Sequence, residues 1–410
     1  MKTIFLNKEN KILILLLLAG ITFRLLLAPL SGFQIDINDW FAWAIRLNNL
    51  NFAQFYSKDI FTDYTPGYLY VLGLLGFLKN QLLIPDNNFY FLLKMPAIIC
   101  DLIIGILIYQ EVRKKVSLIL ALLALSLIVF NPAILFNSSI WGQIDSVLAL
   151  FLLITLIALK DNHLILSSIM FGVAFLIKPQ AIAIAPILAI YLVHHFKLSN
   201  IIKLTIPGLL IIFVLAVPFF PNQTTISLVQ HILNTAGEYP YTSLNAYNFW
   251  GVVGFWIPDK TIWNNLSYQT IGIILFSSYW IILGYFYTRK KLSIYALATL
   301  AFLGFFFLPT KVHERYLYPA LIFLILLSSL YRDRLLLVLT SLLTFLHFFN
   351  LYYVYVYFNE VYFQLPKLLY NPTVYNLLNE NSKGLSLISF SLFILISINI
   401  LKHEIAAKRS

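Results

Sequence analysis

The run ILILLLLAGITFRLLLAPL, residues 12–30, decides the fold class of this chain. It is long and apolar enough to cross the hydrocarbon core of a bilayer, which takes about 20 residues of α-helix. Similar runs recur along the chain, which has 410 residues, is 60% hydrophobic and only 11% charged. A soluble domain of this length keeps a large polar surface, so this composition excludes one. The sequence predicts an all-α, polytopic transmembrane helical bundle.

We expect about twelve spans, with a range of 11–13, and their apolar runs give the approximate boundaries. The predicted spans are 12–30, 92–110, 116–135, 143–159, 163–177, 180–196, 201–219, 266–288, 292–308, 314–330, 335–350 and 385–401. Segment 67–84 has an uninterrupted apolar part of only about twelve residues, which is short for a crossing. The sequence leaves open whether this segment is re-entrant, interfacial or a true span.

Lysine and arginine fall in short clusters between the apolar runs, for example Arg113-Lys114-Lys115 and Arg289-Lys290-Lys291. By the positive-inside rule these clusters are cytoplasmic, which places both termini inside and a multi-pass protein in the plasma (inner) membrane. The net charge of +11 therefore reflects topology and predicts no nucleic-acid partner. The N-terminus resembles a signal sequence in outline, but no small-x-small site follows its apolar run, so an uncleaved first span is expected.

Ionisable side chains near the hydrocarbon layer are costly and usually serve function or pairing. Under this topology most of them meet at the outer face, whereas Asp101 lies inside a span and is expected to be a buried structural partner, for example of Lys94. The outer set comprises Asp36, Asp39, Asp59, Asp63, Asp145, Lys178 and His313-Glu314-Arg315. Snorkelling of Lys178 or Arg315 to the interface and local capping or pairing by Asp145 remain alternatives.

The stretch FQIDINDWFAW, residues 33–43, is predicted to form a helix in the outer interface. In helical geometry Asp36, Asp39, Trp40 and Trp43 share one face, which can turn toward a cavity. An N-terminal cap formed by Asp36 or Asp39 is the alternative interpretation.

Several motifs follow one another in a suggestive order: DINDWFAW, DYTPGYLY (63–70), WGQID (141–145), KPQ (178–180), SLNAYNFWG (243–251) and HERYLYP (313–319). Together they resemble the GT-C superfamily of integral membrane glycosyltransferases. The likeness is greatest to enzymes that use polyprenyl-phosphate sugars, such as the N-glycan glucosyltransferases and bacterial relatives of the GPI mannosyltransferases. It covers residues 12 to about 330 of a single membrane domain, and leaves the spans of 335–401, with the Tyr-rich outer loop 351–384, outside the catalytic module.

The resemblance implies an inverting enzyme that moves a hexose, glucose or mannose, from a polyprenyl-phosphate donor to an acceptor hydroxyl. It makes Asp36, seven residues before Trp43, the general base, with Asp39 as the fallback. The family's Asp-Tyr-Pro-Pro motif appears here with Thr65 in place of the first proline. The family's His-Glu-Lys motif corresponds to His313-Glu314-Arg315.

The residue types suit this chemistry, because inverting transfer needs a base for the acceptor hydroxyl and cations beside the leaving phosphate. For the donor phosphate we expect Lys178, His313 and Arg315. For the sugar and acceptor we expect contacts from Asp63, Trp43, Trp141, Gln143, Asp145, Asn245 and Glu314. Partners would be the donor lipid, a lipid- or glycan-linked acceptor and membrane lipid. No cofactor is expected, although Asp36, Asp39 and Asp145 could ligate a divalent metal.

A transporter or flippase of lipid-linked sugars is the main alternative function. Transporters usually show paired halves and broken helices at mid-membrane, whereas this sequence shows no internal repeat. An O-antigen ligase or polymerase would share a lipid-phosphate site but not the aspartate pattern of the first outer loop.

Overall fold

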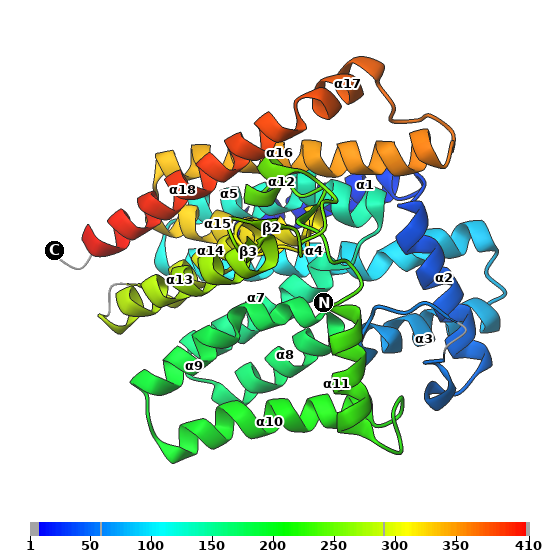
Figure 1. Ribbon diagram of the computed structural model, residues 1–410, viewed down its shortest axis with the longest axis horizontal. Coiled ribbons are helices and arrows are strands. Elements are labelled where there is room, and N and C mark those ends of the chain that lie inside the picture. Colours follow the sequence, from blue (N-terminus) through cyan, green and yellow to red (C-terminus); the bar gives the residue numbers. More distant parts are fainter. Residues whose placement is uncertain (1–7, 58–59, 290–291, 407–410) are drawn as a thin grey trace, which may run out of the picture.

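The structure is a computed structural model that describes residues 8–57, 60–289 and 292–406. Asp59 of the predicted outer set and Lys290 and Lys291 of a predicted basic cluster lie outside the described residues. The described chain is a bundle of helices with two very small sheets, which confirms the all-α prediction (Figure 1).

Each predicted span corresponds to a helix. These helices are α1 (Lys8–Leu27), α4 (Asp86–Lys115), α5 (Leu118–Val129), α7 (Asp145–Lys160), α8 (Leu164–Ile177), α9 (Ala185–His194), α10 (Leu198–Ala216), α13 (Tyr268–Thr288), α14 (Ile294–Phe307), α15 (Tyr318–Tyr331), α16 (Arg334–Tyr355) and α18 (Ser382–Ala406). Within the described residues, 7 helical segments are long and apolar enough to cross a membrane. In this number, helices that follow one another without a break count as one segment. The others are shorter than a typical span, so fewer helices reach full spanning length than the sequence predicts.

Short elements join these helices. They are α2 (Gln34–Asn49), η1 (Phe52–Gln54), α3 (Pro66–Gln81), α6 (Pro132–Leu135), η2 (Phe136–Trp141), η3 (Pro179–Ile184), α11 (Thr224–Thr235), α12 (Phe249–Val253), η4 (Glu314–Leu317), η5 (Val356–Tyr362) and α17 (Pro372–Glu380). Strand β1 (Ser243–Leu244) pairs in parallel with β4 (Val312–His313), and β2 (Ile262–Trp263) pairs antiparallel with β3 (Leu266–Ser267).

Segment 67–84 forms most of α3, whose 16 residues reach only about 24 Å, less than the hydrocarbon core of about 30 Å. Two glycines let α3 approach its neighbours closely. A Cβ on Gly76 would lie 2.2 Å from the carbonyl oxygen of Ala44 in α2, and one on Gly67 would lie 2.5 Å from the backbone of Leu176 in α8. Helix α3 therefore supports α2 from the side.

The two ends of the bundle differ in chemistry. Helices α2 and α3 lie toward the right of Figure 1, whereas the α9–α10 turn and the end of α18 lie at the left. Helix α4 begins shortly after α3 and is 30 residues long, so its other end lies away from α2 and α3. Near that other end Glu111 binds Lys114, Lys160 and the hydroxyl of Tyr295. The basic cluster at the end of α4 belongs to this same end.

The buried charge of Asp101 has a different partner from the one expected. Its carboxylate pairs with Arg24 of α1 at 3.1 Å and accepts hydrogen bonds from Ser138 and Tyr318. The expectation of Lys94 as the partner is wrong, because the Lys94 ammonium is taken by four backbone carbonyls. The structural role expected for Asp101 agrees with these contacts.

Candidate active site

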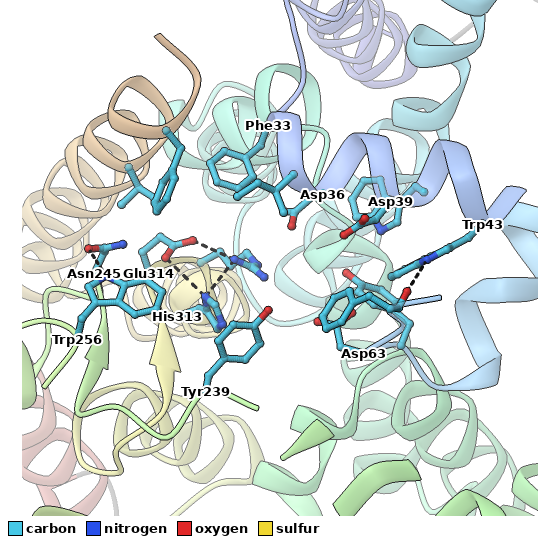
Figure 2. Close-up of a pocket in the computed structure, with 17 residues that line it drawn as sticks. Phe33, Asp36, Asp39, Trp43, Asp63, Tyr239, Asn245, Trp256, His313 and Glu314 are labelled. Carbon is cyan, nitrogen blue, oxygen red and sulfur yellow. Dashed lines mark hydrogen bonds and ion pairs between the residues drawn. The ribbon is translucent and has the colours of Figure 1, made fainter. Parts of the chain in front are cut away.

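One pocket collects most of the polar residues that the sequence analysis singles out (Figure 2). It encloses about 720 Å³ of space, part of which is open solvent at its mouth. Its polar walls are Asp36, Asp39, Asp63, Asn245, His313, Glu314 and Arg315, and its aromatic walls include Trp40, Trp43, Tyr64, Tyr239, Trp256 and Phe358. These residues come from α2, the segment before α3, the loop after α11, the β4–η4 segment and the α16–η5 junction.

Asp36 stands in the first turn of α2, which begins at Gln34 after Phe33. No side chain caps this helix, so the capping alternative for Asp36 and Asp39 is wrong. Oδ2 of Asp36 accepts hydrogen bonds from Trp141 Nε1 at 2.8 Å and from Gln143 Nε2 at 2.7 Å. Both donors bind one oxygen, and within the described residues Oδ1 has no hydrogen-bond donor.

The start of α2 is aligned with these donors by contacts from two sides. The backbone N–H of Phe33 donates to the carbonyl of Trp141 at 2.9 Å, and the two rings stack with centroids 4.2 Å apart. From η5, Asn359 accepts from the Gln34 N–H and donates to the carbonyl of Gly32. The position of Asp36 is therefore set by segments far apart in the sequence.

A buried polar network lies behind Asp36. Lys178 pairs with Asp145 at 2.6 Å and donates to Oε1 of Gln143 at 3.0 Å. Tyr64 donates to the same oxygen at 3.2 Å, and Asn137 donates to Asp145. The layer behind Asp36 therefore consists of residues that do not line the pocket. They are Trp141, Gln143, Asp145 and Lys178.

The His313-Glu314-Arg315 segment forms the wall opposite α2. Parallel pairing of β1 with β4 and a bridge between Asn245 and His313 place these two side chains together. Glu314 pairs with Arg315 at 3.1 Å, and burial raises the pKa of Glu314 to about 7 despite that cation. Burial, reinforced by Arg315 and Lys178, holds the pKa of His313 well below its usual range. His313 is therefore a neutral imidazole beside a guanidinium.

Asp39 and Asp63 form the third polar part of the pocket. Burial, together with the charges of Asp36 and Asp63, raises the pKa of Asp39 to about 7. Burial is also the main cause that raises the pKa of Asp63. At neutral pH these two carboxyl groups therefore hold a proton more readily than exposed ones.

The segment that carries Asp63 is pinned on both sides. The Trp43 indole donates to the carbonyl of Phe61, and His231 contacts the carbonyl of Tyr64 at 3.0 Å. Thr65, which replaces the proline of the family motif, is fully buried and donates to the carbonyl of Leu176 at 2.7 Å. This hydrogen bond restricts the backbone just before α3, at the position where the family motif has a proline ring.

A second pocket adjoins the first and shares Asp63, Tyr239, His313 and Arg315 with it. Its other walls are Pro179, Gln180, Ile182, Ile232, Thr235, Ala236, Phe305, Pro309, Thr310, Lys311, Val312 and Tyr316. Ile182 on this wall is 53% exposed and belongs to the apolar surface of η3. The second pocket therefore joins a cationic centre to an apolar surface.

Several lining residues were missed from the sequence. Tyr239 lacked a distinguishing pattern in a chain with 25 tyrosines, and Tyr64, although part of the DYTPGYLY motif, was given no role. Val354 and Phe358 come from α16 and η5, the region that the sequence analysis places outside the catalytic module. The predicted contacts Trp43 and Trp141 are 1% and 0% exposed, whereas Trp256, which was not singled out, is 40% exposed.

A divalent ion would need several hard ligands at one point. Among the described residues, no group of three or more His, Cys, Asp or Glu side chains is arranged to hold a metal ion. Asp145, one of the ligands considered from the sequence, instead pairs with Lys178.

A comparison with protein families finds a match over part of the chain. Residues 83–223 match the family of dolichyl-phosphate-mannose-protein mannosyltransferases. This stretch contains Trp141, Gln143, Asp145 and Lys178 but neither Asp36 nor His313. The match supports the resemblance predicted from the motifs, which is to membrane glycosyltransferases of the GT-C type, and the apolar helices support a multi-pass membrane protein. No curated protein matches the chain.

Proposed function

We propose that this protein is an inverting hexosyltransferase that moves glucose or mannose from a polyprenyl-phosphate sugar to an acceptor hydroxyl. The observation that carries the proposal is the environment of Asp36. Two neutral donors hold its Oδ2, while the residue lines a pocket shared with His313, Glu314 and Arg315. A base fixed opposite a cationic centre is the arrangement that one-step displacement requires.

In the proposed reaction Oδ1 of Asp36 accepts the proton of the acceptor hydroxyl. The hydroxyl oxygen attacks the anomeric carbon and forms the new glycosidic bond as the bond from that carbon to the phosphate oxygen breaks. The electron pair leaves with the lipid phosphate, whose growing charge is met by Arg315 and by the N–H of neutral His313. Lys178 keeps the base layer in place from behind rather than touching the phosphate, since it pairs with Asp145.

The second pocket suits the phosphate and the first isoprene units of the donor. It contains Lys311 and Arg315 together with the apolar side chains Ile182, Ile232 and Phe305. Asp63, shared by both pockets, is then placed to bind hydroxyls of the transferred sugar.

We further propose that this site faces the outside of the plasma (inner) membrane and that both termini are cytoplasmic. The basic end of α4 lies at the end of the bundle away from α2, as the positive-inside rule requires. Single cysteines in place of exposed residues test this orientation, after replacement of Cys100. A membrane-impermeant maleimide added to intact cells should label Trp263→Cys and leave Lys115→Cys unlabelled. The reverse pattern would refute it.

The function is tested with purified protein, a panel of polyprenyl-phosphate sugars and a membrane lipid and glycan extract as the source of acceptor, by measuring release of the lipid phosphate. We expect release from a glucosyl or mannosyl donor, and its loss in Asp36→Asn. Asp86→Asn is the matched control, because that carboxylate is 69% exposed and lies outside the pocket. Full turnover by Asp36→Asn would exclude Asp36 as the base, and no turnover of any donor by the wild-type protein would exclude the function.

A further inference from the structure

The tryptophans around the pocket differ sharply in what they can offer a ligand. Trp40 and Trp43 are each 1% exposed, and the Trp43 indole N–H is used by the carbonyl of Phe61. Trp141 is fully buried and holds Asp36. Trp256 also lines the pocket and is 40% exposed. A ring face that is to stack on a ligand must be open, so Trp256 meets this condition and the other three do not.

Trp256 is held in an unusual backbone conformation. Its φ is 57°, in the left-handed region that bulky residues rarely adopt, and Asn245 has a φ of 61°. The side chains of these two residues are joined by a hydrogen bond from Trp256 Nε1 to Asn245 Oδ1 at 3.1 Å. Residues in such conformations cluster at ligand sites, where the surrounding structure holds them.

The surrounding structure does hold this pair. The Trp256 N–H donates to the carbonyl of Ser243 at 3.0 Å, and the Thr242 hydroxyl donates to the carbonyl of Gly254 at 2.8 Å. From α16, Asn350 Nδ2 donates to the carbonyl of Asn245 at 2.7 Å. The exposed indole is thus a fixed surface rather than a side chain of a loose loop.

The position of the pair indicates which substrate it meets. Neither Trp256 nor Asn245 lines the second pocket, which reaches the first through Asp63, Tyr239, His313 and Arg315. In Figure 2 Trp256 and Asn245 lie on the far side of His313 and Glu314 from Asp39, Asp63 and Trp43. A donor entering from the second pocket therefore leaves this side of the first pocket to the acceptor.

We propose that Trp256 and Asn245 form the acceptor subsite and that the acceptor is a saccharide whose ring stacks on the indole of Trp256. This inference rests on the proposed function. A pyranose offers an apolar C–H face to an aromatic ring and hydroxyls at its edge. Because Oδ1 of Asn245 is occupied by the indole N–H, its Nδ2 is the group that donates to such a hydroxyl.

The test compares donor turnover with and without acceptor. Purified wild-type protein and the active polyprenyl-phosphate sugar are mixed with methyl glycosides of common hexoses or with short Ser/Thr peptides, at rising concentrations. We expect a methyl glycoside to accelerate lipid-phosphate release and to be glycosylated. Trp256→Ala should raise the glycoside KM by at least about tenfold and leave the donor KM unchanged, while Trp256→Phe recovers part of the loss.

Trp263→Ala is the matched control, because Trp263 is 63% exposed but does not line the pocket. It should leave both KM values unchanged. An unchanged glycoside KM in Trp256→Ala, a changed donor KM alone, or acceleration by the peptides and not by glycosides would each overturn the proposal. If the wild-type protein turns over no donor at all, the proposed function itself fails, which is a different result.

Discussion

The indole N–H of Trp141 lies 2.8 Å from Oδ2 of Asp36, although the two residues are 105 positions apart in the sequence. Trp141 ends the π-helix η2, and Gly142 follows it with a φ of 87°, which turns Gln143 toward the same oxygen. The left-handed backbone conformation at position 142 favours glycine, and a side chain at this position would also contact Lys94 and Ile37.

Trp141→Phe should lower kcat without changing the KM for the donor, because it removes a donor to the base and none to the substrate. A hydrogen bond to a charged group contributes about 1.5–3 kcal/mol, which corresponds to a loss of roughly 10- to 150-fold. The measurement is steady-state lipid-phosphate release, with Trp263→Phe as the control. A rise in donor KM at constant kcat would contradict this positioning role.

Lys94→Met should destabilise the protein and lower activity together. The ammonium of Lys94 binds the carbonyls of Ala28 and Leu30 before α2, and those of Ser139 and Ile140 before Trp141. It therefore joins the two segments that bring Asp36 to its donors. Leaving buried carbonyls without donors costs about 1–3 kcal/mol each, so we expect a loss of at least about 3 kcal/mol.

The measurement for Lys94→Met is thermal unfolding in detergent micelles. Lys115→Met, at the exposed end of α4, is the control and should change stability by less than about 0.5 kcal/mol. Wild-type-like unfolding of Lys94→Met would show that the four carbonyls find other donors.

The pocket carboxylates predict a pH dependence of stability. The pKa of Asp39 is about 7 in the folded protein and near 4 when unfolded, so the folded state binds the extra proton between these values. The stabilising contribution of the protonated form is present below about pH 4 and is lost as the pH rises to about 7. Asp39→Asn should reduce this loss of stability with rising pH, whereas Asp86→Asn should not. Thermal unfolding between pH 4 and 8 measures it, and equal slopes in both variants would disprove the assignment.

The sequence predicts the helical bundle and several of the polar residues that meet in one pocket, because long apolar runs and costly charges are local signals. Asp36, Asp63 and His313 could be recognised in this way. The contributions of Val354 and Phe358 could not, since two more apolar residues carry no signal in an apolar chain. The choice between buried and exposed tryptophans likewise depends on packing: Trp43 and Trp256 look alike until their neighbours are known.

Polar partners across the bundle were also beyond the sequence. Lys94 is nearer than Arg24 to Asp101 in the chain, yet Arg24 meets Asp101 across the α1–α4 contact. Lys178 resembles a free phosphate ligand until its pairing with Asp145 is seen. Such pairings are set by three-dimensional contacts between distant segments, which one sequence does not encode locally.

Removal of divalent ions should leave the activity unchanged. Two of the three carboxylates considered as metal ligands are engaged, Asp145 by Lys178 and Oδ2 of Asp36 by Trp141, and the described residues hold no cluster of three His, Cys, Asp or Glu side chains suited to a metal. In their place Arg315 and His313 stand where the leaving phosphate is proposed to lie. Lipid-phosphate release is measured in EDTA and after adding back Mg²⁺ or Mn²⁺. A loss in EDTA that either ion reverses would require a metal in the mechanism.

The Arg24–Asp101 pair should be a structural element whose loss is not rescued by substrate. Both side chains are fully buried, and Asp101 links α1 and α4 to Ser138 of η2 and to α15. Removing one partner of a buried pair costs about 3–5 kcal/mol, because the other charge remains without compensation. Arg24→Met should therefore unfold at a much lower temperature than the wild type, and Arg24→Met with Asp101→Asn should recover part of the difference. A double variant no more stable than Arg24→Met would show that the hydrogen bonds of Asp101, and not the ion pair, carry the stabilisation.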